Sequence, residues 1–167
     1  MKRITFFIFL VVAVIASTFS ASGQKDIFSG TWKIDRSKST LSEYIPTLAT
    51  ITININGDSL LTDRVYEGGD GQEYPFTENL TLDGKEYKIT IYDMPRKSKA
   101  TWSEQEGAVI MESTTTFYDS GSPADFISKE TWKVDKANNI LTISYINKMS
   151  TEEMNGAFIF NKAEQVK

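Results

Sequence analysis

Apolar and polar residues alternate in short segments along most of the chain, and turn residues such as glycine, asparagine and aspartate separate these segments. Because successive side chains of a strand point to opposite faces, this alternation predicts strands with one buried face. The first strand is expected over 28–35, where Phe28, Gly30, Trp32 and Ile34 share a face. Further strands are expected over 49–56, 60–67, 76–82, 87–92, 99–104, 108–118, 126–134, 140–147 and 157–161.

Three connections between these strands are predicted from their residues. Residues 94–97 are expected to end the preceding strand, because Pro95 lacks an amide donor. Residues 119–123 are expected to form a loop, and residues 150–155 a single helical turn. No longer segment has helical periodicity, which excludes parallel architectures that alternate strands and helices.

The predicted fold class is all-β, an antiparallel up-and-down β-barrel of about 8–10 strands. Closure into a barrel is favoured because it removes exposed edges from strands rich in β-branched residues. In the first strand, Gly30 allows a close backbone approach, and the large ring of Trp32 is expected to plug one end of the barrel.

Residues 1–23 are predicted to be a secretory signal peptide, and residues 24–167 a single domain. Lys2 and Arg3 precede an apolar run over 4–16, and the small residues after it allow cleavage following Ser22 or Gly23. The apolar run is shorter than the roughly 20 residues that span a membrane. We therefore expect a secreted or periplasmic protein without a stable membrane anchor.

Charge and composition narrow the function classes. The chain has 22 acidic and 18 basic residues, for a net charge of −4, which argues against nucleic acid as a partner. It has no histidine and no cysteine, so the commonest general base, the commonest zinc ligand, thiol chemistry and disulfides are all excluded. We expect a non-enzymatic monomer with no cofactor and no metal ion.

The opening strand also carries a family resemblance. The segment Gly30-Thr31-Trp32-Lys33-Ile34-Asp35, followed by Ser37-Lys38-Ser39, resembles the start of secreted bacterial lipocalin-like proteins, which have calycin-type barrels. The hairpin at 83–87 and the segments 140–146 and 155–162 resemble later parts of that group. The resemblance implies a container for a small ligand, without naming the ligand. It also implies a late basic residue packed over Trp32, for which Lys148 and Lys162 are the candidates.

The candidate ligand-binding residues are aromatic, apart from one carboxylate, and are expected to line an apolar cavity. They are Trp102, Phe117, Glu130, Trp132, Tyr145 and Phe160. Trp32 is expected to be structural instead.

Two groups of charged residues allow alternative interpretations. Glu78 and Glu130 alternate with apolar neighbours, so both would enter the barrel if those faces point inward. The interpretation that we favour from the sequence is that the register slips or the strands splay there. The basic cluster of Arg96, Lys97 and Lys99 is expected to be a solvated turn, with an anion site at the barrel mouth as the alternative.

Three functions are consistent with these patterns. The first is a barrel that binds a small, largely apolar ligand in its cavity. The second is an interaction or scaffold module with a filled core, which would show an exposed apolar patch and no cavity. The third is a carboxylate-based enzyme, which would need Glu78 and Glu130 close together with shifted pKa values.

Overall fold

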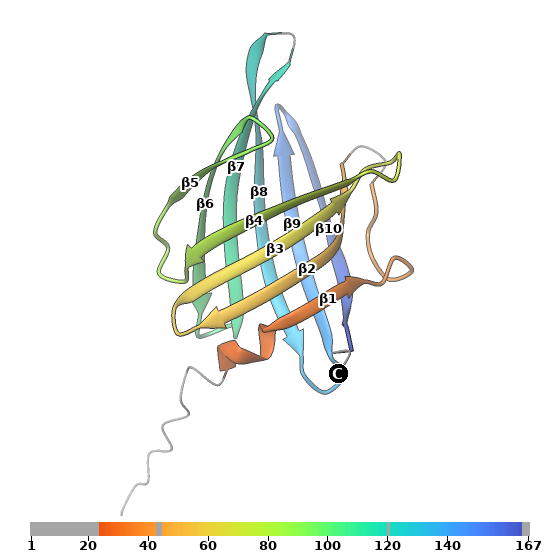
Figure 1. Ribbon diagram of the computed structural model, residues 1–167, viewed down its shortest axis with the longest axis vertical. Helices are drawn as coiled ribbons and strands as arrows, with labels where there is room; N and C mark the ends of the chain where they lie inside the picture. Colours follow the sequence, from red (N-terminus) through yellow and green to blue (C-terminus); the bar gives the residue numbers. More distant parts are fainter. Residues whose placement is uncertain (1–23, 43–44, 120, 165–167) are drawn as a thin grey trace, which may run out of the picture.

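In the part of the chain that the structure describes, ten antiparallel strands form one sheet that curls into a nearly closed up-and-down barrel (Figure 1). The computed structural model describes residues 24–42, 45–119 and 121–164, so the predicted signal peptide lies outside the described residues. A short 3₁₀ helix, η1 (Asp26–Phe28), precedes the first strand. The strands are β1 (Gly30–Ile34), β2 (Thr47–Asn56), β3 (Ser59–Glu67), β4 (Glu73–Thr81), β5 (Tyr87–Ile91), β6 (Met94–Ser103), β7 (Ala108–Asp119), β8 (Ser122–Asp135), β9 (Ile140–Met149) and β10 (Glu152–Lys162).

The barrel closes in two different ways. The sheet order is β4-β3-β2-β1-β10-β9-β8-β7-β6-β5, so the first and last strands of the chain pair side by side. The sheet begins with β4, and the segment that follows β4 in the chain pairs with β6 near the other end of the sheet. We call this line of contact between β4, its following segment and β6 the seam. There the Gly84 N–H donates to the Ala100 carbonyl at 2.8 Å, and the Trp102 N–H donates to the Leu82 carbonyl at 3.1 Å. β5 continues the sheet beyond β6, outside this closure.

The end of the barrel beside η1 is closed by Trp32, as predicted. Its side chain is fully buried, and its indole N–H donates to the Phe28 carbonyl at 2.8 Å. The Lys162 ammonium lies 5.0 Å from the centre of the Trp32 ring. Gly30 has a φ of +134°, which residues with a Cβ rarely adopt, and this explains why glycine is needed; a Cβ there would also stand 2.8 Å from Cε of Lys162, near the flexible end of that side chain. Lys162, and not Lys148, therefore covers the tryptophan.

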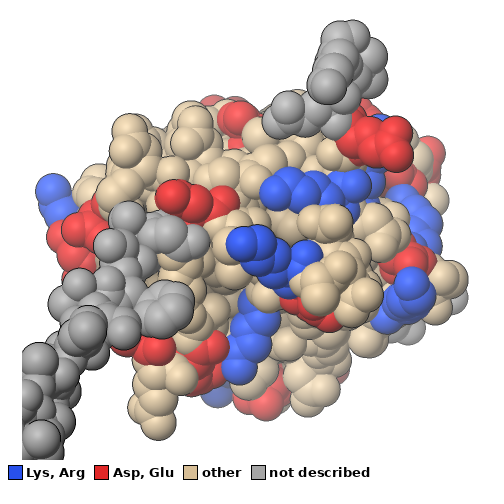
Figure 2. Space-filling model, turned by 90° about the horizontal axis from the view of Figure 1, so that it is seen from below, with Lys and Arg blue, Asp and Glu red and all other residues tan. Residues whose placement is uncertain are grey.

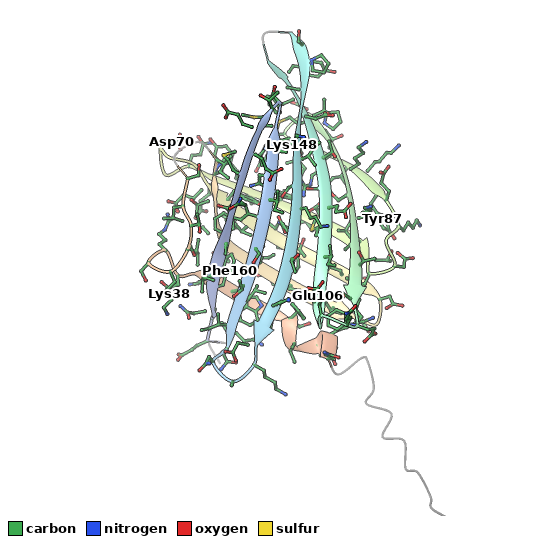
Figure 3. All side chains as sticks on the ribbon, turned by 180° about the vertical axis from the view of Figure 1, so that it is seen from behind. Lys38, Asp70, Tyr87, Glu106, Lys148 and Phe160 are labelled. Atoms are coloured by element: carbon green, nitrogen blue, oxygen red, sulfur yellow. The ribbon has the colours of Figure 1, made fainter. Side chains whose placement is uncertain are left out.

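Exposed charges of both signs surround this closed end. Figure 2 looks at it from below and shows Lys and Arg side chains interspersed with Asp and Glu side chains. Figure 3 places Glu106 near this end and Asp70 and Lys148 near the opposite, open end. Among the residues that the structure describes, no helix is long and apolar enough to cross a membrane.

The turn after β1 is held by Asp35. Its carboxylate accepts hydrogen bonds from the Ser37 hydroxyl at 2.6 Å and the Ser37 N–H at 3.2 Å, and it pairs with Lys38 at 3.0 Å. These hydrogen bonds, the Ser37 hydroxyl first, lower the pKa of Asp35 to about 2. The polar residues at this position are explained by turn chemistry.

Inward-facing side chains at the closed end form the apolar core. They include Trp32, Ile51, Ile53, Leu60, Leu80, Val109, Trp132, Leu141, Ile143 and Phe160. Within each strand these buried residues occupy every second position. The prediction that alternating apolar residues face the core is therefore confirmed. The predicted all-β barrel is confirmed as well.

Three predicted connections are wrong in detail. β6 begins at Met94 and includes Pro95, because Pro95 lies before the part of β6 that pairs with β7 and its missing N–H interrupts no ladder there. The helical turn expected over 150–155 is strand from Glu152 onward, after a tight turn in which Ser150 has a φ of +55°. β7 and β8 extend into the predicted loop at 119–123, reaching Asp119 and starting again at Ser122.

Candidate functional site

A cavity of about 630 Å³ occupies the barrel at the end opposite Trp32. Its wall carries eight aromatic residues, and its lining comes from β3 to β10, from the turn after β5 and from the segments next to β2 and β3. The aromatic lining residues are Tyr66, Tyr74, Phe76, Tyr92, Phe117, Phe126, Tyr145 and Phe158. Tyr66 and Phe76 stack in parallel with their ring centres 5.8 Å apart, which gives one side a flat apolar surface.

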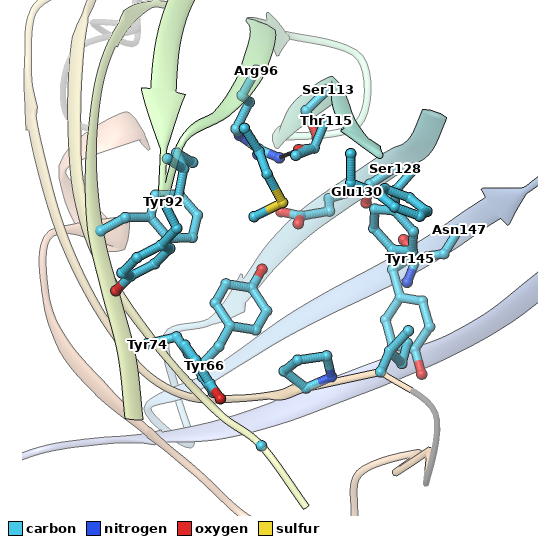
Figure 4. A pocket seen from close by; sticks show the side chains of 18 of the residues that line it. Tyr66, Tyr74, Tyr92, Arg96, Ser113, Thr115, Ser128, Glu130, Tyr145 and Asn147 are labelled. Carbon is cyan, nitrogen blue, oxygen red and sulfur yellow. Dashed lines mark hydrogen bonds between the residues drawn. The ribbon is translucent and has the colours of Figure 1, made fainter. Parts of the chain in front are cut away.

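Polar side chains enter the same cavity from the wall formed by β6, β7, β8 and β9. They are Arg96, Ser113, Thr115, Ser128, Glu130 and Asn147. Figure 4 shows these groups together, with Tyr66, Tyr74 and Tyr92 across the cavity from them. Hydrogen-bonding groups therefore gather on one wall, where Tyr145 also lies, and Tyr66, Tyr74 and Tyr92 lie on the other.

Strand register aligns four of the small polar residues. Ser98 pairs with Ser113, Ser113 with Ser128, and Ser128 with Asn147, so they form a continuous row across four strands. We call Ser98, Ser113, Ser128 and Asn147 the polar row. All four are buried, because each is an inward-facing position of its strand.

Part of the polar row has unused hydrogen-bonding capacity. The Ser98 hydroxyl donates to Glu78 at 2.6 Å. The hydroxyls of Ser113 and Ser128 have no hydrogen-bond partner among the described residues, and the side-chain oxygen of Asn147 is buried without a donor in that part of the chain. A buried polar group left unpaired costs about 1–3 kcal/mol, so this wall is suited to a bound molecule that supplies partners.

Below the polar row, an ion pair crosses the barrel interior from β3 to β8. Arg64 is fully buried, and its Nη1 and Nη2 donate to Oε1 and Oε2 of Glu130, each at 3.0 Å. Oε2 of Glu130 also accepts the Trp132 indole N–H at 2.7 Å, and the guanidinium lies 5.1 Å from the Trp132 ring centre. Burial opposes the charge of Arg64, but attraction and hydrogen bonding from Glu130, together with Tyr66 and Glu78, outweigh burial and raise the pKa of the guanidinium.

A second ion pair spans the seam between β4 and β6. Arg96 donates from Nε and Nη2 to the two carboxylate oxygens of Glu78, at 2.9 and 3.2 Å. Burial of Glu78 favours its neutral form, but attraction and hydrogen bonds from Arg96, with help from Arg64 and Ser98, hold the pKa of Glu78 below its ordinary value. Nη1 of Arg96 donates to the Thr115 hydroxyl at 3.0 Å.

The two pairs form one charge-neutral layer under the cavity. Nε of Arg64 lies 3.9 Å from Glu78, which links the pairs to each other. Nη1 of Arg64 donates to the Tyr66 hydroxyl at 3.2 Å, and burial raises the pKa of that hydroxyl. Two guanidinium groups and two carboxylates thus cancel, while the layer separates the aromatic cavity from the apolar closed end.

The predicted ligand-binding residues fall into two groups along the barrel axis, one beside the cavity and one nearer the closed end. Phe117, Glu130 and Tyr145 line the cavity. Trp102, Trp132 and Phe160 lie below it in or against the apolar core, where the Trp102 ring packs edge-on to Phe28 at 6.0 Å. These three lower aromatics are not among the residues that line this cavity, and their contact with a ligand stays a prediction.

The favoured interpretation of the two glutamates is wrong. Glu78 and Glu130 both face inward. Their buried charges are tolerated because each glutamate is neutralised by an arginine that was not placed in the barrel from the sequence. The basic cluster at β6 is also not a solvated turn. Arg96 is buried, whereas Lys97 and Lys99 are exposed on the outer face, as strand alternation requires.

Arginine at an inward position was the signal that the sequence analysis missed. Arg64 shares a strand face with Leu60 and Thr62, so the alternation of β3 already placed it inside. Among the described residues, no group of three or more metal-ligating side chains could hold a metal ion. Comparisons with protein-family models, with curated proteins and with solved structures each found no match.

Proposed function

We propose that this protein is a lipocalin-like binding protein that holds a small, largely apolar ligand in the cavity of its barrel. The observation that carries the proposal is the aromatic cavity of about 630 Å³ above a neutral buried layer. This volume lies within the roughly 300–1,000 Å³ typical of small-molecule sites. The mixture of apolar walls with a few convergent polar groups is also typical of such sites.

Apolar burial is the driving force that this cavity offers. A ligand that loses about 250 Å² of apolar surface to these walls gains about 6 kcal/mol before the costs of association. The stacked surface of Tyr66 and Phe76 favours flat or extended apolar bodies.

The same observations disfavour the two alternatives. An interaction module with a filled core leaves no role for the aromatic cavity. A carboxylate-based enzyme needs a proton donor or a free base, but each glutamate is held by both oxygens in an arginine fork, and the lowered pKa of Glu78 keeps it ionised. The proposal therefore includes no catalytic step.

The proposal extends to location and assembly. The basic start, the apolar run and the small residues of 1–23 support export and cleavage. N-terminal sequencing of the exported protein is expected to begin after Ser22 or Gly23, and sedimentation is expected to show a monomer. An uncleaved chain retained in the cytoplasm would contradict the first expectation.

A fluorescence titration tests the binding function. The uncharged probe N-phenyl-1-naphthylamine is expected to bind purified protein saturably, with enhanced emission. Ser113→Phe fills the cavity and is expected to weaken binding at least tenfold, whereas Thr114→Phe, on the outer face of the same strand, is the matched control. Absence of saturable binding to the unmodified protein would contradict the proposal.

A further inference from the structure

The polar wall of the cavity constrains which end group a ligand can bury. It consists of one arginine, one glutamate and four uncharged side chains. If the cavity binds an amphipathic molecule, as proposed above, the polar end of that molecule must find partners on this wall. The chemistry of that polar end follows from which groups of the wall are already paired within the protein.

The guanidinium groups are not available as simple anion sites. Arg64 is held by both oxygens of Glu130, and Arg96 by both oxygens of Glu78. Arg96 has five N–H groups, of which three donate hydrogen bonds to Glu78 and Thr115. The other two have no hydrogen-bond acceptor among the described residues. These can donate to any ligand oxygen, but the positive charge behind them is already balanced by Glu78.

The lining leaves no positive charge free to pair with a ligand carboxylate. Among the described lining residues, the charge of Arg96 is balanced by Glu78 and that of Glu130 by Arg64, Asp70 is an anion, and no lysine is present. An anionic ligand would therefore leave its charge without a counterion in a largely apolar cavity. The desolvation of an unpaired carboxylate costs several kcal/mol, which neutral groups avoid.

Unused hydrogen bonds point to a ligand that both donates and accepts. The buried oxygen of Asn147 is an acceptor without a donor, while the hydroxyls of Ser113 and Ser128 can donate or accept. An ionised carboxylate only accepts, so it can take a hydrogen bond from the Asn147 amide nitrogen but offers no proton to the Asn147 oxygen. A hydroxyl or a primary amide supplies the missing proton and an oxygen at the same end.

We propose that the cavity selects ligands whose buried end is an uncharged donor–acceptor group, a hydroxyl or an amide, held by Ser113, Ser128 and Asn147. It discriminates against carboxylates with the same apolar body. This inference rests on the proposed binding function and specifies its ligand class: apolar alcohols, phenols and amides.

A matched series of end groups tests this selectivity. Dodecanol, dodecanamide and dodecanoate, together with 2-naphthaleneethanol and 2-naphthaleneacetate, are titrated against bound N-phenyl-1-naphthylamine at pH 8, where both acids are ionised. The alcohols and the amide are expected to displace the probe at concentrations at least tenfold lower than the acids. Equal or stronger displacement by the acids would overturn the inference.

Two variants locate the selectivity on the polar wall. Asn147→Leu removes the unpaired acceptor at similar volume and is expected to reduce the ratio of alcohol to acid affinity several-fold, with both affinities measured by displacement of the probe from the variant itself. Asn54→Leu, at an exposed position of β2, is the control and should leave the ratio unchanged. An unchanged ratio in Asn147→Leu would contradict the assignment of the end group to this wall.

The outcomes separate this inference from the function on which it rests. Saturable probe binding with acids preferred leaves the binding function standing and refutes the selectivity. No probe binding by the unmodified protein refutes both. Because the ligand series uses the unmodified protein, the test holds even if Asn147→Leu fails to fold.

Discussion

Replacement of Arg64 is expected to destabilise the barrel far more than replacement of a surface partner in a similar ion pair. In Arg64→Met, Glu130 keeps only the Trp132 N–H as a hydrogen-bond partner among the described residues. A buried charge deprived of its partner typically costs 3–5 kcal/mol, out of a total stability of about 5–15 kcal/mol for a domain. The expected loss is therefore about 3–5 kcal/mol.

An exposed ion pair on the same barrel supplies the control. Lys99 and Glu112 lie 2.9 Å apart with side chains 47% and 44% exposed, whereas the side chain of Arg64 is 0% exposed. Lys99→Met is expected to cost less than about 1 kcal/mol, because solvent screens such pairs. The comparison isolates burial, since both substitutions remove a cation that touches a glutamate.

The double variant Arg64→Met/Glu130→Gln distinguishes a lost partner from lost packing. Removal of both charges is expected to restore about 2 kcal/mol or more relative to Arg64→Met, giving a favourable coupling energy in the double-mutant cycle. Unfolding by urea, followed by far-UV circular dichroism, measures each free energy without interference from the altered Trp132 environment. The reasoning is refuted if Arg64→Met costs no more than Lys99→Met, or if the two substitutions are simply additive.

Three further predictions concern the closed end, the turn after β1, and the contact between the β5–β6 turn and β4. Gly30→Ala is expected to lose about 1–2 kcal/mol in urea unfolding, because its φ is +134° and the new Cβ would meet Lys162; a stability equal to that of the unmodified protein would contradict this. The pKa of Asp35 is lowered to about 2, so this carboxylate stabilises the fold at pH values above its unfolded pKa, and the stabilisation is lost as the pH falls toward 2. In thermal melts, the stability difference between Asp35→Asn and the unmodified protein should therefore shrink from pH 4 to pH 2 and stay constant above pH 5. Tyr92→Phe removes the 2.6 Å hydrogen bond to the Pro75 carbonyl and should speed amide exchange at the edge of β4, while exchange in β10 is unaffected.

The strands could be predicted from the sequence because their pattern is local. Alternation over eight or more residues, as in 49–56, fixes which side chains face inward without knowledge of any partner strand. Errors occurred where a local signal was overridden by pairing. Pro95 looked like a breaker, but it stands where β6 has a neighbour on one side only.

Much of the site could not be predicted, because alternation gives the face of a side chain and not its height along the barrel. Trp132 and Tyr145 both point inward and belong to the core, yet of the two Tyr145 alone lines the cavity. The charge layer was hidden for a related reason. Arg64 and Glu130 are 66 residues apart, so nothing near either residue in the chain announces that its charge will be balanced.

At the seam, the closure of this barrel depends in part on side-chain contacts and therefore on which residues stand there. Around the rest of the wall, backbone ladders join neighbouring strands regardless of which residues they carry. Where β4 faces β6 above the bridge from Asp83 to Thr101, the contact is carried by Glu78, Arg96 and Ser98. The wall therefore has one line along which it parts with the least loss of backbone hydrogen bonding, and this line runs beside the cavity.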